Sequence, residues 1–146
     1  LYNEPANQFV AGFIGSPPMN FFEGTLQGQN GSLVFNEGGF TLQVDPAHTG
    51  KLDGYLDKEI VFGIRPEDLR DAQHVPDGNP AHQFDATVEV VEPMGSEVYL
   101  YLTTGKTTFT ARVEAHEQID VNQQFRLATT MEKAHFFDKQ TGATLV

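Results

Sequence analysis

Short runs of alternating apolar and polar residues, separated by turn-forming residues, occupy most of the chain after residue 20. Asn30-Gly31 lies between two such runs, and this pair is a strong hairpin signal because both residues tolerate positive φ. Within 83–92 we expect one face to be buried, and its members are Phe84, Ala86, Val88 and Val90. Further strands are expected over 21–27, 32–35, 40–44, 59–64, 97–104, 107–113 and 124–130. Strands this short and closely spaced predict a mainly β fold, a small barrel or sandwich, rather than alternating β and α units.

Two stretches of the chain are similar to stretches further along it. The matching pairs are 59–69 with 124–136, 65 positions apart, and 23–27 with 85–90. Two imperfect β units, about 21–70 and 83–146, packed as one barrel, would explain both matches. Strands of similar composition also align in this way by chance, so the sequence leaves a duplication open.

A helical pattern precedes the strands. Residues 4–14 place five apolar side chains on one face, namely Ala6, Phe9, Val10, Phe13 and Ile14. Gly15 suits a left-handed helix end, and the prolines at 17 and 18 cannot continue the helix. The pattern predicts a short N-terminal helix that is marginal alone and must pack against another part of the protein.

Charge and composition exclude several classes of protein. The chain has no cysteine, so disulfides and cysteine-based zinc sites are excluded. Its net charge of −11 repels nucleic-acid phosphates and anionic lipids, so we expect no nucleic-acid partner. The acidity is also explained by solubility alone.

The sequence contains no catalytic or cofactor-binding motif. There is no phosphate-binding G-x-x-x-x-G-K-[ST] loop and no H-E-x-x-H metal motif. His74 and His82 share a loop with Asp71 and Asp77, and such residues can bind a metal weakly. The simpler interpretation is that they are solvated loop residues. We therefore expect no catalytic, cofactor or metal site in this chain.

Two segments predict a rim of contact residues. In "GIRPEDL" (63–69), Pro66 fixes a tight turn at a strand end and brings Arg65 close to Glu67. In "VVEPMGSEVYLY" (90–101), Gly95 marks a bend or bulge between two strands, with Glu92 and Glu97 beside it. An intramolecular turn lock and a contact with a partner remain equal readings of the first segment.

Four segments together resemble a known family. "LYNEPANQFVAGFIGSPPMNF", "GIRPEDL", "VEVVEPMGSEVYLYL" and "HFFDKQTGATL" occur in its order and span nearly the whole chain. They resemble the C-terminal regulatory (TOBE, OB-like) domain of sugar-type ABC importer ATP-binding subunits, such as those for maltose and glycerol 3-phosphate. The resemblance implies an OB-like barrel of two TOBE-type units over 21–146. It also implies that residues 1–20 are a helix and linker from a missing ATPase domain, whose Walker segments would precede Leu1.

The resemblance also implies a function. A non-catalytic domain of this kind holds two ATP-binding subunits together and receives regulators, while ATP and Mg²⁺ bind in the missing domain. Its partners would be a second copy of itself, that ATPase domain in cis and membrane permease subunits, with a cytoplasmic location at the inner membrane. The expected contact residues are Gln8, Phe21, Arg65, Glu67, Glu92, Gly95 and Glu97.

Two other functions remain as alternatives. Related domains bind small oxyanions, for which the candidates here are Ser96, Thr103, Thr104 and Lys106, although the net charge disfavours an anion site. An OB-like face can also bind oligonucleotides, and Tyr99, Tyr101 and Phe109 supply aromatic rings. Only Lys106 and Arg112 are basic neighbours of these rings, so we expect no such binding.

Overall fold

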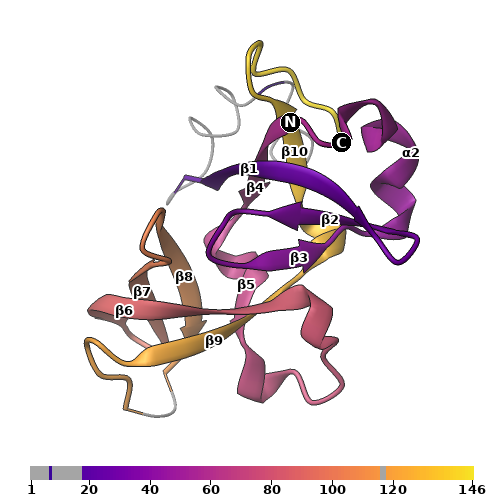
Figure 1. The fold of residues 1–146 in the computed structure, drawn as a ribbon. Coiled ribbons are helices and arrows are strands. Elements are labelled where there is room, and N and C mark those ends of the chain that lie inside the picture. Colours follow the sequence, from indigo (N-terminus) through magenta and orange to yellow (C-terminus); the bar gives the residue numbers. More distant parts are fainter. Residues whose placement is uncertain (1–6, 8–17, 116–117) are drawn as a thin grey trace.

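The structure is a computed structural model that describes residue 7 and residues 18–115 and 118–146 (Figure 1). The helix predicted over 4–14, and with it Gln8, lies outside the described residues. Asn7 forms an isolated antiparallel bridge with Ala143. No helix in the described part is long and apolar enough to cross a membrane.

The described part is built mainly from strands, as the sequence predicts. The strands are β1 (Asn20–Gln29), β2 (Ser32–Asn36), β3 (Thr41–Gln43), β4 (Glu59–Ile64), β5 (Leu69–Asp71), β6 (Gln83–Met94), β7 (Glu97–Thr103), β8 (Thr108–Glu114), β9 (Gln124–Thr129) and β10 (His135–Asp138). One short helix, α2 (Thr49–Leu52), lies between β3 and β4. The predicted hairpin at Asn30-Gly31 is confirmed, because both residues have positive φ, 53° and 80°. β5 and β10 are absent from the predicted runs, since each is too short to show a pattern.

The strands form two five-stranded antiparallel sheets with the same topology. The first has the order β10-β4-β1-β2-β3 and the second has the order β5-β9-β6-β7-β8. Position by position, each strand of one sheet has an equivalent in the other. Figure 1 shows the first sheet above the second.

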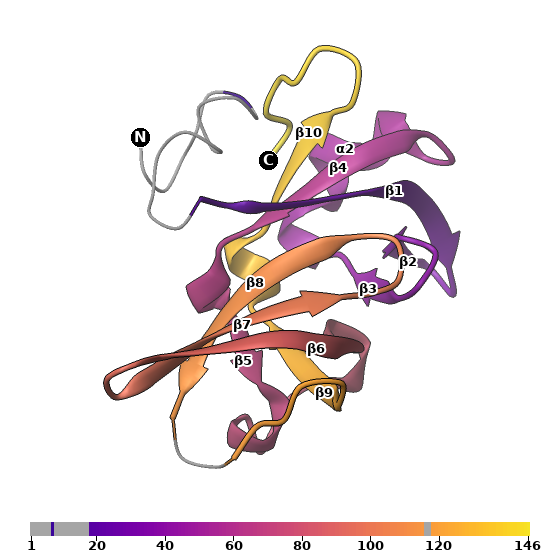
Figure 2. The ribbon, with the colours of Figure 1, turned by 90° about the vertical axis from the view of Figure 1, so that its left-hand side faces the viewer.

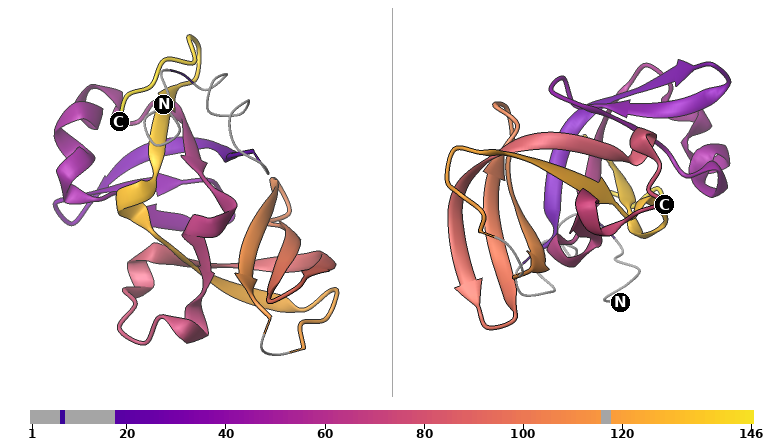
Figure 3. Two further views of the ribbon diagram at one scale, coloured as in Figure 1. Left: turned by 180° about the vertical axis from the view of Figure 1, so that it is seen from behind. Right: turned by 90° about the horizontal axis from the view of Figure 1, so that it is seen from below.

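Each half of the chain gives its last strand to the other half's sheet. After β4 the chain passes through a 3₁₀ turn, Pro66–Asp68, and continues as β5 at the edge of the second sheet. After β9 it passes through an equivalent turn, Met131–Lys133, and continues as β10 at the edge of the first sheet. The left view of Figure 3 shows both crossing segments, one magenta and one orange to yellow. This exchange interlocks the two sheets.

The second sheet curls into a nearly closed barrel. Its edge strands, β5 and β8, lie alongside each other without a continuous ladder of hydrogen bonds. The prediction of a small, mainly β barrel is therefore confirmed.

The inner faces of both sheets share one apolar core. Phe22 of β1 is fully buried, and its ring contacts Phe62 of its own sheet at a centroid separation of 5.7 Å. The same ring contacts Phe84 at 6.3 Å and Phe109 at 5.0 Å, both from the second sheet. Because these rings belong to a single cluster, we expect the two sheets to unfold together.

Strand β6 contains a β-bulge that reverses its two faces. The register with β7 shifts between Val88 and Val90, so Glu89 is the inserted residue. The prediction that Val90 faces the core is wrong, because its side chain is 51% exposed and Val91 packs against the core instead. One extra residue moves every later side chain to the opposite face.

Candidate functional site

The outer face of the β6–β7 hairpin carries an exposed apolar patch. Val90 and Met94 of β6 are each 51% exposed, and Tyr101 of β7 is 36% exposed. Val90 and Tyr101 are paired directly across the strands, and the Tyr101 hydroxyl donates a 2.7 Å hydrogen bond to Glu92. We call Val90, Glu92, Met94 and Tyr101 the hairpin face. Figure 2 shows the hairpin projecting from the second sheet.

The hairpin face gathers most of the large exposed apolar side chains of the described residues. Three of the five such side chains belong to it, and the other two, Leu56 and Val121, lie apart on other segments. Scattered exposed apolar residues are ordinary, whereas adjacent ones mark contact surfaces. The hydrogen bond from Tyr101 to Glu92 raises the pKa of the tyrosine and fixes the ring beside Val90.

The turn and the free edge of this hairpin limit how a partner can bind. Gly95 has a φ of 75° and Ser96 has no positive φ, which is the pattern of a two-residue type II′ turn. The expected bend at Gly95 is therefore a hairpin turn, and the bulge lies at Glu89. The backbone of β6 is bonded on its β9 side as far as Val88, which exchanges hydrogen bonds with Asn122 and Gln123, and in the part beyond it Pro93 donates no backbone hydrogen bond. The free part of this edge is therefore poorly suited to pairing with another strand, and the hairpin presents its exposed side chains on its face.

A small charged pocket of about 150 Å³ lies next to the hairpin turn. It is lined by Glu67 from the segment after β4, and by Glu97 and Arg112 from β7 and β8. The Arg112 Nε atom lies 3.5 Å from Glu97 Oε1. Burial lowers the pKa of Arg112, but a hydrogen bond with Tyr99 and the carboxylates of Glu97 and Glu67 together raise it overall.

Arg65 lies inside the protein at the start of the turn after β4. It is only 7% exposed, so its guanidinium does not belong to an open surface. Burial and the nearby Glu67 raise the pKa of Asp68, and the charge of Arg65 opposes this rise. Of the two readings of Arg65, this position favours a lock within the chain.

The predicted contact residues do not all lie together. Glu92, Gly95 and Glu97 lie together on the hairpin, and Glu67 lines the same pocket as Glu97. Phe21 lies apart, on the outer face of the first sheet, where its ring meets that of Phe137 at a centroid separation of 5.7 Å. Gln8 lies outside the described residues.

Sequence reasoning missed Val90 and Met94, the two most exposed apolar members of the hairpin face. Val90 was expected in the core, and Met94 was assigned no role. One signal was present, because the adjacent Val90 and Val91 break the alternation of apolar and polar residues. Such a break is typical of a bulge.

A buried carboxylate binds the hydroxyl of Thr104, one of the residues considered for an oxyanion site. Glu37, in the turn between β2 and β3, is 1% exposed. Its Oε2 atom accepts hydrogen bonds from the hydroxyls of Thr104 at 2.7 Å and Thr107 at 2.6 Å, and its Oε1 accepts one from the Gly39 N–H at 2.9 Å. Lys106 donates from Nζ to the Glu37 carbonyl at 2.8 Å. The contact joins the β2–β3 turn of one sheet to the equivalent β7–β8 turn of the other.

The four oxyanion candidates do not meet in one place. Ser96 lies in the turn before β7, whereas Thr103, Thr104 and Lys106 lie at the far end of that strand. A seven-residue strand separates the two ends by roughly 20 Å at about 3.3 Å per residue.

The loop histidines form no metal cluster in the part of the chain that is described. His74 Nε2 lies 3.6 Å from Asp71 Oδ2. Across residues 18–115 and 118–146, no group of three or more potential ligands is placed to hold a metal ion.

Two family models together match nearly the whole chain. The model described as the MalK OB fold domain matches residues 15–69, and the model described as the TOBE domain matches residues 62–137. The two matches meet where the chain crosses from the first sheet to the second. They confirm the resemblance inferred from the four sequence segments.

Similar curated proteins are ATP-binding proteins of transporters. MsmK of Streptococcus mutans, a multiple sugar-binding transport ATP-binding protein, is 44% identical over 99% of this chain and 38% of its own length. The trehalose/maltose import protein MalK of Thermococcus litoralis is 40% identical over 99% of this chain and 39% of its own length. The oligosaccharide import protein MsmX of Bacillus subtilis is 37% identical over 97% of this chain and 38% of its own length. The chain thus spans less than two fifths of the length of these relatives.

A solved structure shares the fold. The molybdate-binding protein ModG superposes with a TM-score of 0.58 over 80% of this chain and 94% of its own, at 15% sequence identity. Likeness at this level of identity concerns the fold alone. The TOBE model covers more than half of the chain and spans both sheets. The chain therefore belongs to the TOBE domain family, and its residues 15–69 are similar to the MalK OB fold domain.

Proposed function

We propose that this chain is the non-catalytic regulatory and dimerisation domain of the ATP-binding subunit of a bacterial ABC importer for sugars or glycerol phosphate. The observation that carries this proposal is the similarity, along almost the entire chain, to sugar-importer ATP-binding proteins. ATP and Mg²⁺ would bind in a separate domain of that subunit. The subunit would lie at the cytoplasmic side of the inner membrane, attached through its permease partners.

The hairpin face supports the dimerisation part of the proposal. Two copies that meet through Val90, Met94 and Tyr101 would remove exposed apolar surface from water, which favours association. A contact that persists while the ATPase domains separate makes their next encounter intramolecular, and this raises their effective concentration. Glu92 and Glu97 would lie at the border of such a contact, where charges set orientation more than affinity.

The oxyanion-binding alternative has less support. The hydroxyls of Thr104 and Thr107 already bind the carboxylate of Glu37, and Ser96 lies at the other end of β7. An added oxyanion would have to displace a buried side chain.

The dimerisation proposal predicts that Val90→Asp weakens self-association of the chain. A charge at the centre of an apolar contact should raise the dimer dissociation constant at least about tenfold. Sedimentation equilibrium over a range of concentrations measures this constant. Val121→Asp is the matched control, because Val121 is 52% exposed and lies away from the hairpin. A chain that stays monomeric at every concentration, or an equal effect of both substitutions, would contradict the proposal.

A further inference from the structure

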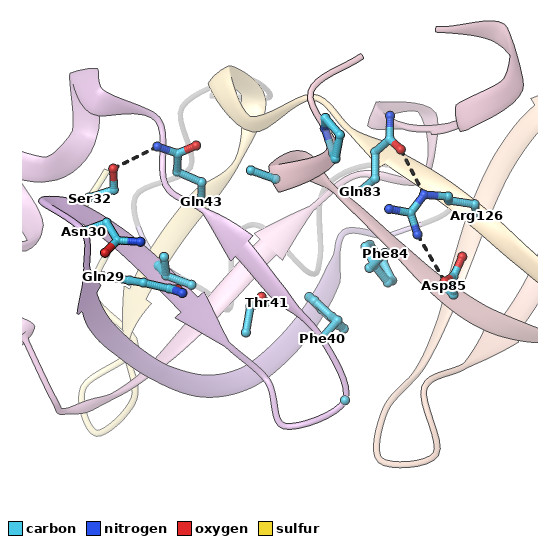
Figure 4. A pocket seen from close by; sticks show the side chains of 14 residues that line it. Gln29, Asn30, Ser32, Phe40, Thr41, Gln43, Gln83, Phe84, Asp85 and Arg126 are labelled. Atoms are coloured by element: carbon cyan, nitrogen blue, oxygen red, sulfur yellow. Dashed lines mark hydrogen bonds and ion pairs between the residues drawn. The ribbon is translucent and has the colours of Figure 1, made fainter. Parts of the chain in front are cut away.

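A hollow of about 530 Å³ lies between the two sheets. The β1–β2 hairpin and β3 form one side, and the 3₁₀ turn Pro80–His82, the start of β6 and β9 form the other (Figure 4). Sites for small molecules usually have volumes of about 300–1,000 Å³. Because its two sides belong to different sheets, a molecule bound in this inter-sheet pocket would contact both halves of the chain.

The walls of the inter-sheet pocket are polar but carry no net charge. Amide and hydroxyl side chains dominate them, namely Gln29, Asn30, Ser32, Thr41, Gln43 and Gln83. The charged lining residues are Asp85 and Arg126, which pair with each other at 3.1 Å. In a chain with a net charge of −11, this balance selects for a neutral ligand. Amides both donate and accept hydrogen bonds, so the matching groups on that ligand are hydroxyls.

Several of these side chains are already held in place. Arg126 donates from Nε to Gln83 Oε1 at 3.0 Å and from Nη1 to Asp85 Oδ2 at 3.1 Å, as Figure 4 shows. On the opposite side, Gln43 donates from Nε2 to the Ser32 hydroxyl at 3.0 Å. Fixed groups lose less entropy when a ligand binds, so both sides of the pocket are pre-organised.

Other polar groups of the pocket are available. No hydrogen bond to another described residue is made by the side chains of Gln29, Asn30 or Thr41. The hydrogen bonds described above use Gln43 Nε2 and Asp85 Oδ2. The side-chain oxygen Oε1 of Gln43 and the carboxylate oxygen Oδ1 of Asp85 therefore remain as acceptors for a ligand. Donors and acceptors therefore converge from both sheets.

The floor of the pocket is aromatic. Phe40 of the β2–β3 turn and Phe84 of β6 stack with centroids 4.1 Å apart and planes inclined by 19°. Val34 and Ala81 add apolar surface beside them. A sugar ring presents C–H groups on its faces and hydroxyls at its rim, so an apolar floor beneath polar walls matches it.

We propose that the inter-sheet pocket binds a neutral mono- or disaccharide. A regulatory role for this site rests on the proposed function. In that case, a free sugar on the cytoplasmic side would signal to the ATP-binding subunit how much transported substrate is present. A sugar that contacts both sheets would favour one relative arrangement of them by its differential affinity. The binding itself is independent of self-association through the hairpin face.

The test is a titration of the chain with glucose, maltose and trehalose, followed by two-dimensional amide NMR. For at least one of the sugars we expect saturable shifts confined to the segments that line the pocket, residues 29–34, 39–43, 80–85 and 126. Arg126→Met and Gln43→Ala should each weaken that binding about tenfold, the usual effect of losing a hydrogen bond to a pre-organised group. The Arg126 side chain is exposed and that of Gln43 is half-buried, and the spectrum of each variant shows directly whether it is folded.

Lys139→Met is the matched control. It also removes an exposed ion pair, between Lys139 and Glu59 at 3.0 Å, but lies outside the pocket. We expect unchanged sugar affinity in this variant. Three results would overturn the proposal: no saturable shifts, an affinity in both Arg126→Met and Gln43→Ala equal to that of the wild type, or tighter binding of glucose 6-phosphate than of glucose. None of these outcomes alters the sedimentation result for Val90→Asp, so the two proposals can fail separately.

Discussion

Replacement of Phe22 by alanine should lower the free energy of unfolding by about 3–5 kcal/mol, the usual loss for a buried phenylalanine. Phe22 is fully buried on β1, and its ring lies within 5.0 to 6.3 Å of aromatic rings from both sheets. This loss is the sum of the transfer free energy of the ring and the free-energy cost of the cavity that it leaves. Urea denaturation followed by circular dichroism measures it.

Phe21→Ala is the matched control for Phe22→Ala. The neighbouring ring is half-buried and contacts the small cluster on the outer face of the first sheet, so its loss should be clearly smaller. Both variants should unfold in one transition, because the sheets share a core. Equal losses in the two variants, or separate transitions for the two sheets, would contradict a single core centred on Phe22.

Replacement of Glu37 by alanine should lower the free energy of unfolding by about 2–4 kcal/mol. The carboxylate is buried and accepts three hydrogen bonds, from Gly39, Thr104 and Thr107. Hydrogen bonds to a charged acceptor contribute more than neutral ones, and the change leaves three donors without this acceptor. The loss should appear as a lower midpoint in urea without a change of slope.

Two comparisons isolate the role of the Glu37 carboxylate. Glu37→Gln keeps the shape and one oxygen acceptor, so it should lose less stability than Glu37→Ala. Added formate should raise the melting temperature of Glu37→Ala and leave the wild type unchanged, because the vacated hydroxyls and N–H suit a small carboxylate. A loss no larger than that of Glu59→Ala, whose carboxylate is exposed, would contradict a structural role for Glu37.

The strands and their turns could be predicted from local patterns. Alternation located β6 and β7 to within two residues at each end, and Asn30-Gly31 marked the first hairpin. The exchange of β5 and β10 could not be predicted in the same way. These strands have three and four residues, and their partners lie far away in sequence, so no local pattern specifies the pairing.

Only part of the candidate site could be predicted, for two physical reasons. A single inserted residue at Glu89 reversed the faces of β6, which placed Val90 on the surface and completed the hairpin face. No local pattern singles out Glu37, because its partner Thr104 is 67 positions away. The inter-sheet pocket likewise exists only after both halves of the chain are assembled.

The measurement that tests the proposed function most directly is the self-association of the complete ATP-binding subunit without nucleotide. We expect a subunit that ends with this domain to sediment as a dimer when ATP is absent. Without the domain, the ATPase part should sediment as a monomer until ATP is added. A dimerisation role would be contradicted if removal of this domain did not change the oligomeric state of the nucleotide-free subunit, whether both forms were monomers or both were dimers.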